Sequence, residues 1–395
     1  MKKFRRFLKT NVRVITTVTF AGVAITGLLL YRLGSLVKGL SWSEYQTTTA
    51  VYGWHGMYHQ PLYLPLDFLR SIAYFVTTNH SQLVARLPNV LIGAVTILCF
   101  SLLIRLWYGN RTAIFATALF ASSAYVLHVS RLASYDALYL MIVPTLLLSI
   151  VALQRKPDTI SFYYLTVLLW GMLIYIPGAI WLVLLAIFWQ RKSMKYGWRI
   201  LHIWWQKLLL VLAGLIWLPL LITDLTKLTN LRLWLGMPQD FAGPLTIARQ
   251  LADVFGHLLI RGQSNPALWV DRAPIFDIFG LAMIAIGVYF FAANWRNGRA
   301  RLLTSFLIVS AILVCLGGPV SLGLLVPIAY ILAATGIAYL LREWMQVFPF
   351  NPIARSLGVG MIVIVVSLSC LYNVRAYFVA WPHNLDTQKT FIHRI

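Results

Sequence analysis

The sequence predicts an all-α polytopic membrane protein with about eleven transmembrane helices, on three observations. Of its 395 residues, 60% are hydrophobic and only 11% are charged, whereas a soluble domain carries about 25% charged residues. Apolar segments close to the roughly 20 residues that a spanning helix needs recur along the chain. Lys and Arg lie in short runs between these segments, so the net charge of +22 indicates topology control and attraction to anionic lipid heads rather than nucleic-acid binding.

The first apolar segment follows the basic start Lys2-Lys3-Phe4-Arg5-Arg6 and favours an uncleaved helix. It is longer than the core of a signal peptide, and no small-x-small cleavage site ends it. Two later segments, 178–189 and 302–316, are short, so the predicted number carries a margin of about two. The predicted spans are residues 14–37, 87–106, 112–129, 137–153, 160–176, 178–189, 208–225, 275–293, 302–316, 322–341 and 357–372.

The charges between the spans predict the orientation. With the N-terminus in the cytoplasm and the C-terminus outside, twenty of the thirty-three Lys and Arg residues fall on the inner side. Nine of the eleven Asp and Glu residues fall on the outer side, and every inner loop is positive, as the positive-inside rule expects. The sequence therefore predicts an integral protein of a plasma membrane, bacterial in type, with its chemistry on the outer face where the acids gather.

Two outer regions are longer than a turn, residues 38–86 and residues 224–274. Within the first, residues 62–76 are apolar but too short to span, and they include Asp67 and Arg70. In the second, Arg249, Asp253, His257 and Arg261 recur every four residues, with apolar residues on the other faces. Both patterns predict amphipathic helices at the membrane interface. No separate soluble domain is visible, so residues 1–395 are predicted to form one integral membrane domain.

The first outer region supplies the leading candidate for chemistry, Glu44. A carboxylate just after the first span can act as a general base or help to hold a metal ion. The equally weighted alternative is that Glu44 caps a helix that begins near Ser43, or solvates a loop. His55 and His59 have metal-type spacing, but Gly56 argues against a regular helix, so ordinary hydrogen-bonded histidines are favoured.

The hairpin between the third and fourth spans supplies a second candidate, with Arg131 and Asp136 at the membrane surface. Asp136 suits the N-terminus of the fourth span, and the residue types alone favour an ion pair or a helix cap. The functional alternative is that Arg131 meets a phosphate, for which guanidinium geometry is well suited. Arg249 and Asp253 are most simply an i,i+4 pair, and their stripe with His257 can also face lipid phosphates.

Several ordered motifs resemble one family of membrane enzymes. Ser43-Glu44 is followed by Tyr58-His59-Gln60-Pro61-Leu62-Tyr63, and Ala85-Arg86-Leu87-Pro88 opens the second span. A short basic turn contains Trp107-Tyr108-Gly109-Asn110-Arg111, and the hairpin Ser130-Arg131-Leu132-Ala133-Ser134-Tyr135-Asp136-Ala137-Leu138 follows. Over residues 38–150 the chain thus resembles the polyprenyl-phosphate-sugar-dependent glycosyltransferases of the protein O-mannosyltransferase and lipid A aminoarabinose transferase type. Beyond that range the likeness rests on topology, including an outer turn with Gly318-Pro319.

The resemblance implies a GT-C fold and an inverting transfer of a sugar from a polyprenyl-phosphate donor to a glycan, lipid or protein acceptor outside. It implies Glu44 and Asp136 as catalytic residues, and a divalent metal is left open with Glu44, His59 and Asp136 as its candidates. The family's catalytic Asp corresponds to Ser43 here, and its Glu-Lys-Pro reads His59-Gln60-Pro61. Substrate contacts are expected from these residues: His59, Gln60, Arg86, Arg131, Arg249 and His257. The alternatives are a lipid or solute transporter or flippase, and a catalytically inactive membrane scaffold.

Overall fold

The computed structural model describes residues 22–49, 62–77, 81–201, 203–220, 228–240, 243–262, 265–270 and 273–393. Within these ranges the chain is helical, and the one β pairing is an isolated bridge between Leu40 and His393. The bridge joins the start of the first outer region to the C-terminal segment.

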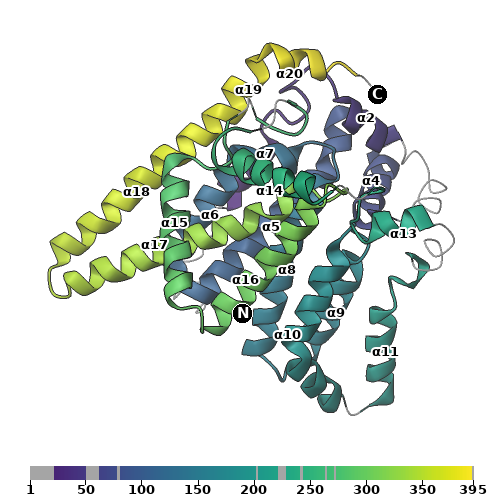
Figure 1. Ribbon diagram of the computed structural model, residues 1–395, viewed down its shortest axis with the longest axis horizontal. Helices are drawn as coiled ribbons and strands as arrows, with labels where there is room; N and C mark the ends of the chain where they lie inside the picture. The colour runs from purple at the N-terminus through teal and green to yellow at the C-terminus, as the bar shows by residue number, and fades with distance from the viewer. Residues whose placement is uncertain are drawn as a thin grey trace, which may run out of the picture.

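Figure 1 shows the helices of the described ranges. Their bounds are α2 (Trp42–Thr49), α4 (Leu64–Thr77), α5 (Gln82–Tyr108), α6 (Asn110–Ser122), α7 (Ala124–Arg131), α8 (Asp136–Arg155), α9 (Ile160–Leu173), α10 (Ala179–Ile200), α11 (Trp204–Gly214), α13 (Leu228–Trp234), α14 (Pro244–Leu259), α15 (Ile278–Ala293), α16 (Gly298–Cys315), η1 (Leu322–Leu324), α17 (Val326–Val347), α18 (Pro352–Arg375), η2 (Ala376–Ala380), α19 (Trp381–His383) and α20 (Leu385–Thr390).

Each of the eleven predicted spans contains helix in its described part, which confirms the all-helical membrane architecture. Five helical stretches in the described ranges are long and apolar enough to cross a membrane, or six if α6 and α7 form one span bent by 61° at Ser123. The helices α9 and α15 are apolar but shorter, and α10 carries basic residues in its second half. The number eleven therefore stays a prediction.

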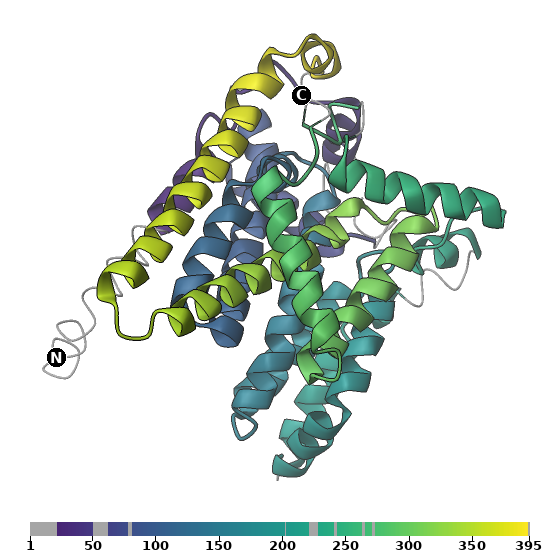
Figure 2. The same ribbon diagram turned by 60° about the vertical axis from the view of Figure 1, so that its left-hand side comes forward.

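Burial sorts the helices into a centre and a periphery. In α8, 78% of the apolar window is buried, whereas in α18 only 22% is, so α18 offers most of its apolar side chains to the surroundings. α18 runs along one flank of the bundle (Figures 1 and 2). Such an exposed apolar surface fits a helix that faces lipid acyl chains.

The two predicted interfacial helices are confirmed as helices. α4 covers residues 64–77 of the first outer region, and α14 lies across the direction of the long helices (Figure 2). Val254 and Leu258 of α14 are buried, while Arg249 and Asp253 are exposed. An amphipathic helix in this orientation suits a membrane interface.

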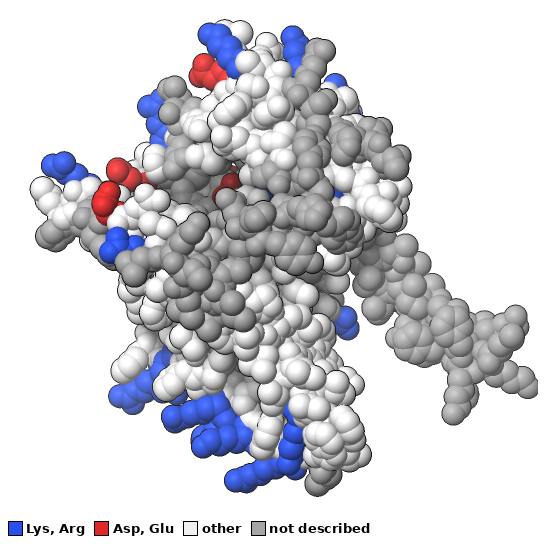
Figure 3. Space-filling model, turned by 90° about the vertical axis from the view of Figure 1, so that its right-hand side faces the viewer, with Lys and Arg blue, Asp and Glu red and all other residues white. Residues whose placement is uncertain are grey.

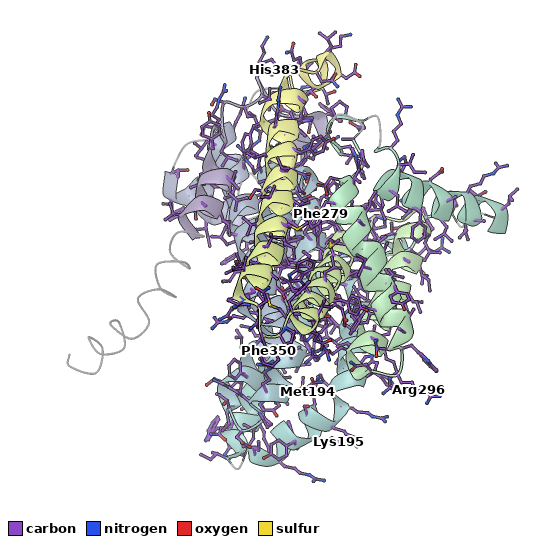
Figure 4. The ribbon with its side chains drawn as sticks, turned by 90° about the vertical axis from the view of Figure 1, so that its left-hand side faces the viewer. Met194, Lys195, Phe279, Arg296, Phe350 and His383 are labelled. Atoms are coloured by element: carbon purple, nitrogen blue, oxygen red, sulfur yellow. The ribbon has the colours of Figure 1, made fainter. Side chains whose placement is uncertain are left out.

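The two ends of the bundle differ in charge. On the face shown in Figure 3, the visible Asp and Glu lie toward the upper end together with some Lys and Arg, whereas the lower end shows Lys and Arg without visible Asp or Glu. Lys195 of α10 and Arg296 of the α15–α16 turn mark the lower end in Figure 4, and His383 marks the upper end. We call the lower end the basic end and the upper end, which carries α2, α4 and α14, the carboxylate end.

Candidate site at the carboxylate end

The position of Glu44 is set by a local sequence pattern at the start of α2. Ser41 precedes α2, and its hydroxyl accepts a hydrogen bond from the Glu44 backbone N–H at 3.2 Å. In return the Ser41 N–H donates to Glu44 Oε2 at 3.1 Å. This reciprocal pair is a capping box, which satisfies two N–H groups that a helix start otherwise leaves without partners. The helix cap that the sequence offered as an alternative is therefore present, with the helix beginning at Trp42.

The same carboxylate joins three distant segments. Arg86 of α5 donates from Nε to Oε1 and from Nη2 to Oε2, both at 3.0 Å, and the Ala133 N–H donates to Oε1 at 2.8 Å. Together with Ser41, four donors meet the four lone-pair positions of the carboxylate, which is fully buried. Burial alone would raise the pKa of Glu44, but the Arg86 charge and these hydrogen bonds lower it below the usual 4.5.

The guanidinium group of Arg86 also has hydrogen-bond partners within the protein. Besides Glu44, its guanidinium donates to the carbonyls of Leu33 and Gly39, each at 3.2 Å, and only 2% of the residue is exposed. The Glu44–Arg86 pair thus fastens α2 and α5 to the end of the first helical segment. A buried pair with all its hydrogen bonds satisfied holds geometry, because removal of either partner leaves an uncompensated charge.

Asp67 of α4 has much weaker partners. Its Oδ1 lies 3.4 Å from Nη1 of Arg70, and its Oδ2 accepts from the Tyr135 hydroxyl at 3.3 Å. Burial raises the pKa of Asp67 to about 6, although Arg70 and the Tyr135 hydrogen bond act in the opposite direction. Asp67 keeps a small exposed fraction of 7%, whereas Glu44 is 0% exposed. A carboxylate of this kind is suited to accept a proton near neutral pH.

Arg70 holds the α7–α8 loop against α4. Its Nη2 donates to the Ala133 carbonyl at 2.9 Å, and its guanidinium lies 5.1 Å from the centre of the Tyr135 ring. Asn89 of α5 donates to the Ser134 carbonyl at 2.6 Å and completes the support. The loop that carries Tyr135 is therefore fixed from α2, α4 and α5 at once.

Three tyrosines, Tyr63, Tyr135 and Tyr139, lie near Asp67 and Asp136. Tyr63 stacks on Tyr135 with ring centres 4.0 Å apart, and its hydroxyl lies 3.3 Å from that of Tyr139. Burial, with the charges of Asp136 and Asp67 nearby, raises the pKa of Tyr63 to about 12, so its phenol stays protonated. Its φ of 65° is unusual for a bulky residue, and such strain concentrates at functional sites. Asp136 is partly exposed at the first position of α8, where its side chain interacts with Ser134 and Ser321.

Arg131 has different surroundings from those the sequence favoured. The two ion pairs of the described ranges are Asp67–Arg70 and Glu44–Arg86, so Arg131 and Asp136 form none. Arg131 donates from Nη2 to the Tyr31 carbonyl and packs against the rings of Tyr377 and Phe378. Only 1% of Arg131 is exposed, and its Nε and Nη1 have no hydrogen-bond partner. A buried guanidinium with free donors retains the capacity to bind an anion.

The two expected substrate contacts on α14, Arg249 and His257, are at least partly exposed. Arg249 is exposed, and no ion pair with Asp253 is found in the part of the chain that the structure describes. His257 is half-buried, and its Nδ1 lies 3.0 Å from the Arg261 carbonyl, so Nε2 is the nitrogen that remains for a ligand.

The metal possibility finds no support among the described residues. They contain no group of three or more His, Cys, Asp and Glu side chains that could hold an ion, and the lone pairs of Glu44 are taken by N–H donors. His59 and Gln60, like His55, lie outside the described residues. We therefore derive no chemical step through a metal.

Asp67 belongs to the first outer region that supplies the candidates for chemistry, but the sequence by itself assigned it no role. The apolar pattern of residues 62–76 indicates an interfacial helix, and an acid and a base three positions apart on such a helix suggest an ordinary surface pair. The available signal was that both Asp67 and Arg70 interrupt an otherwise apolar segment. In the structure both side chains are buried. Burial of charged groups costs free energy, so charged side chains in such positions indicate a structural or functional role.

No protein-family model and no curated protein sequence matches this chain. Solved structures match in fold. The structure of ArnT from Cupriavidus metallidurans bound to undecaprenyl phosphate has a TM-score of 0.55 and 13% identity, over 94% of this chain and 76% of ArnT. The archaeal oligosaccharyltransferase AglB from Archaeoglobus fulgidus, in complex with an inhibitory peptide and a dolichol-phosphate, has a TM-score of 0.51 and 14% identity, over 92% of this chain and 56% of AglB. This chain thus has the GT-C fold of polytopic membrane proteins, as the sequence predicted.

Proposed function

We propose that this protein is a glycosyltransferase that moves a sugar from a polyprenyl-phosphate donor to an acceptor at the carboxylate end, on the outer face of the membrane. The observation that carries the proposal is Asp67, a buried carboxylate whose pKa is raised to about 6 and whose two side-chain contacts, with Tyr135 and Arg70, are long. The fold shared with ArnT, whose structure holds undecaprenyl phosphate, supports the class of donor.

In the proposed reaction Asp67 is the general base. It accepts the proton of the acceptor hydroxyl while the acceptor oxygen attacks the anomeric carbon from the side opposite the phosphate. The bond between the anomeric carbon and the phosphate oxygen breaks, and the polyprenyl phosphate leaves with the electron pair. The result is inversion at the anomeric carbon. The expectation that Glu44 is the base requires a lone pair free for a proton, and Glu44 has four donors at 2.8–3.1 Å instead. We propose that Glu44 and Arg86 are positioning residues.

The other candidates fit around this reaction. We propose that Asp136, partly exposed beside Tyr63 and Tyr139, orients a sugar or acceptor hydroxyl. The exposed Arg249 and the half-buried His257 on α14 would meet the donor phosphate, and the free donors of Arg131 would add to that charge if the segment around Tyr31 moves. His59 and Gln60 remain proposed substrate contacts from the first outer region.

The test uses purified protein in vesicles with a radiolabelled polyprenyl-phosphate sugar and a mixture of lipid, glycan and protein acceptors. We expect transfer by the wild type, with a rate that falls as the pH drops below about 6, because Asp67 then becomes protonated. Asp67→Asn should lose about 10²–10⁴-fold in rate, the usual contribution of a general base. The matched control Asp386→Asn changes an exposed acid on α20, which has no proposed role in transfer, and should transfer normally. Full turnover by Asp67→Asn would contradict the proposed role.

One observation favours an inactive scaffold as the second candidate. Ser43, at the position of the acid in the family that the sequence resembles, is exposed in the first turn of α2 and its hydroxyl lies 3.1 Å from that of Ser41. If the wild type shows no transfer and Ser43→Asp gains it, the scaffold is supported. Movement of the labelled lipid across the vesicle without transfer would instead support a flippase.

A further inference from the structure

A cavity lies at the basic end, lined by none of the residues that the proposed reaction uses. Its volume is about 500 Å³, within the range of small-ligand sites. It is bounded by the junction of α5 and α6, by the end of α15 with the turn into α16, and by the second half of α17. The α15–α16 turn, marked by Arg296, and the turn after α17, marked by Phe350, both lie toward the lower part of Figure 4.

Three arginines from three different helices line this cavity: Arg111, Arg299 and Arg342. No acidic residue of the described ranges lines it, and all three arginines are exposed. Arg299 is oriented, because its Nη1 donates to the Trp107 carbonyl at 3.0 Å. A smaller cavity of about 270 Å³ shares Arg299 and adds Arg155. Converging like charges without a carboxylate repel one another, and an anion that binds between them relieves the repulsion.

The rest of the lining combines hydroxyl groups with aromatic rings. The Tyr108 hydroxyl and the Thr335 hydroxyl lie 2.8 Å apart, and both residues line the cavity. Trp107, Phe290 and Tyr339 add flat apolar surface beside the arginines. An inorganic anion in water needs only the charges, whereas a phosphate attached to an apolar body uses both kinds of surface.

We propose that this cavity binds a phosphate group, carried by an anionic phospholipid of the leaflet at the basic end. The guanidinium groups of Arg111, Arg299 and Arg342 would contact the phosphate, and the aromatic rings would contact the glycerol and the first part of the acyl chains. Basic pockets between spanning helices on the positive side of a membrane protein are suited to such head groups. The site is independent of the glycosyl transfer at the other end.

The experiment is native mass spectrometry of the whole protein in detergent with equal amounts of phosphatidylglycerol and phosphatidylcholine. We expect the wild type to retain phosphatidylglycerol preferentially. Each arginine lost should weaken this preference about fivefold, since a basic residue near anionic lipid contributes about 1 kcal/mol. The pocket variant combines Arg111→Gln, Arg299→Gln and Arg342→Gln. The control combines Lys195→Gln, Arg296→Gln and Arg301→Gln, which removes the same charge from exposed residues that do not line the cavity.

Loss of the preference in the pocket variant alone supports the proposal. If both triple variants lose the preference equally, the proposal is overturned, because the charge of the whole basic end would then account for the preference. It is also overturned if neither variant loses the preference, because the three arginines would then not be needed. A second measurement, thermal unfolding with inorganic phosphate, identifies the source of the phosphate group. Stabilisation that the pocket variant lacks, without any lipid preference, supports the same site with free phosphate as its ligand. If the triple variant fails to fold, Arg111→Gln alone decides, since no described hydrogen bond uses that side chain.

Discussion

At the scale of single residues, Glu44 and Asp67 differ in their donors. Glu44 receives hydrogen bonds from Arg86, Ser41 and Ala133 at 2.8–3.1 Å, which hold it ionised. Asp67 has contacts of 3.3 and 3.4 Å with Tyr135 and Arg70, which do not offset the cost of burial. Because short charge-assisted hydrogen bonds favour the ionised form, the two pKa values move in opposite directions from similar starting points.

This difference predicts the effect of Glu44→Gln on stability. The free energy of unfolding should fall by about 3–5 kcal/mol, because Arg86 is left as an unpaired buried charge. The folded-state pKa of Glu44 lies below its usual 4.5, so its contribution is present above that pH and is lost as the pH falls through the folded value. Unfolding of the detergent-solubilised protein at pH 7 and pH 4 measures both effects.

The control for this prediction is Glu343→Gln, the same chemical change at a half-buried residue outside the two described ion pairs. It should change stability little. Wild-type stability in Glu44→Gln at pH 7 would show that the pair does not fasten the carboxylate end, and the positioning role proposed for Glu44 would then be wrong.

At the scale of elements, small residues set how closely the helices approach. α15 and α17 cross where Gly287 and Gly336 are buried. A Cβ atom on Gly336 would lie 2.1 Å from the Met283 carbonyl oxygen, and one on Gly287 would lie 2.0 Å from that of Leu332. These distances are too short for any side chain, so the crossing depends on glycine, as at other close helix contacts in membranes.

We therefore expect Gly336→Ala to destabilise the protein by about 1–3 kcal/mol, the usual cost of overpacking. Gly360→Ala is the matched control, because a Cβ atom there has nothing within 4 Å. It should be neutral or slightly stabilising, since alanine favours the helix. Thermal unfolding compares the two variants. Equal melting temperatures would mean that α15 and α17 can separate without cost.

At the scale of the whole molecule, the distribution of charged residues predicts the orientation of the protein across the membrane. On the face of Figure 3, the end where Lys195 and Arg296 lie shows Lys and Arg without visible Asp or Glu, and His383 lies at the opposite end (Figure 4). The positive-inside rule assigns the basic end to the cytoplasm. The proposed transfer site and the proposed phospholipid site would then lie on opposite sides of the membrane.

Single cysteines test this orientation in intact cells. Cys99, Cys315 and Cys370 are free thiols and are first replaced by Ala. His383→Cys should react with a membrane-impermeant maleimide added outside, and Lys195→Cys should react only after permeabilisation, because its end faces the cytoplasm. The reverse pattern would contradict both the orientation and an outer position for the transfer site.

The sequence by itself determined the membrane class, the helical segments and the candidate region, because a bilayer demands long apolar helices and a separation of charge that appear in local composition. The capping box at Ser41 and Glu44 is also local, since its two residues are three positions apart. The role of each charged group depends on segments far along the chain. Arg86 and Ala133 occupy Glu44 from 42 and 89 residues away, while Asp67 is left with two long contacts. Only the tertiary structure decided which carboxylate receives four short hydrogen bonds and which has only two long contacts, because burial and the number of hydrogen-bond donors are properties of the assembled fold.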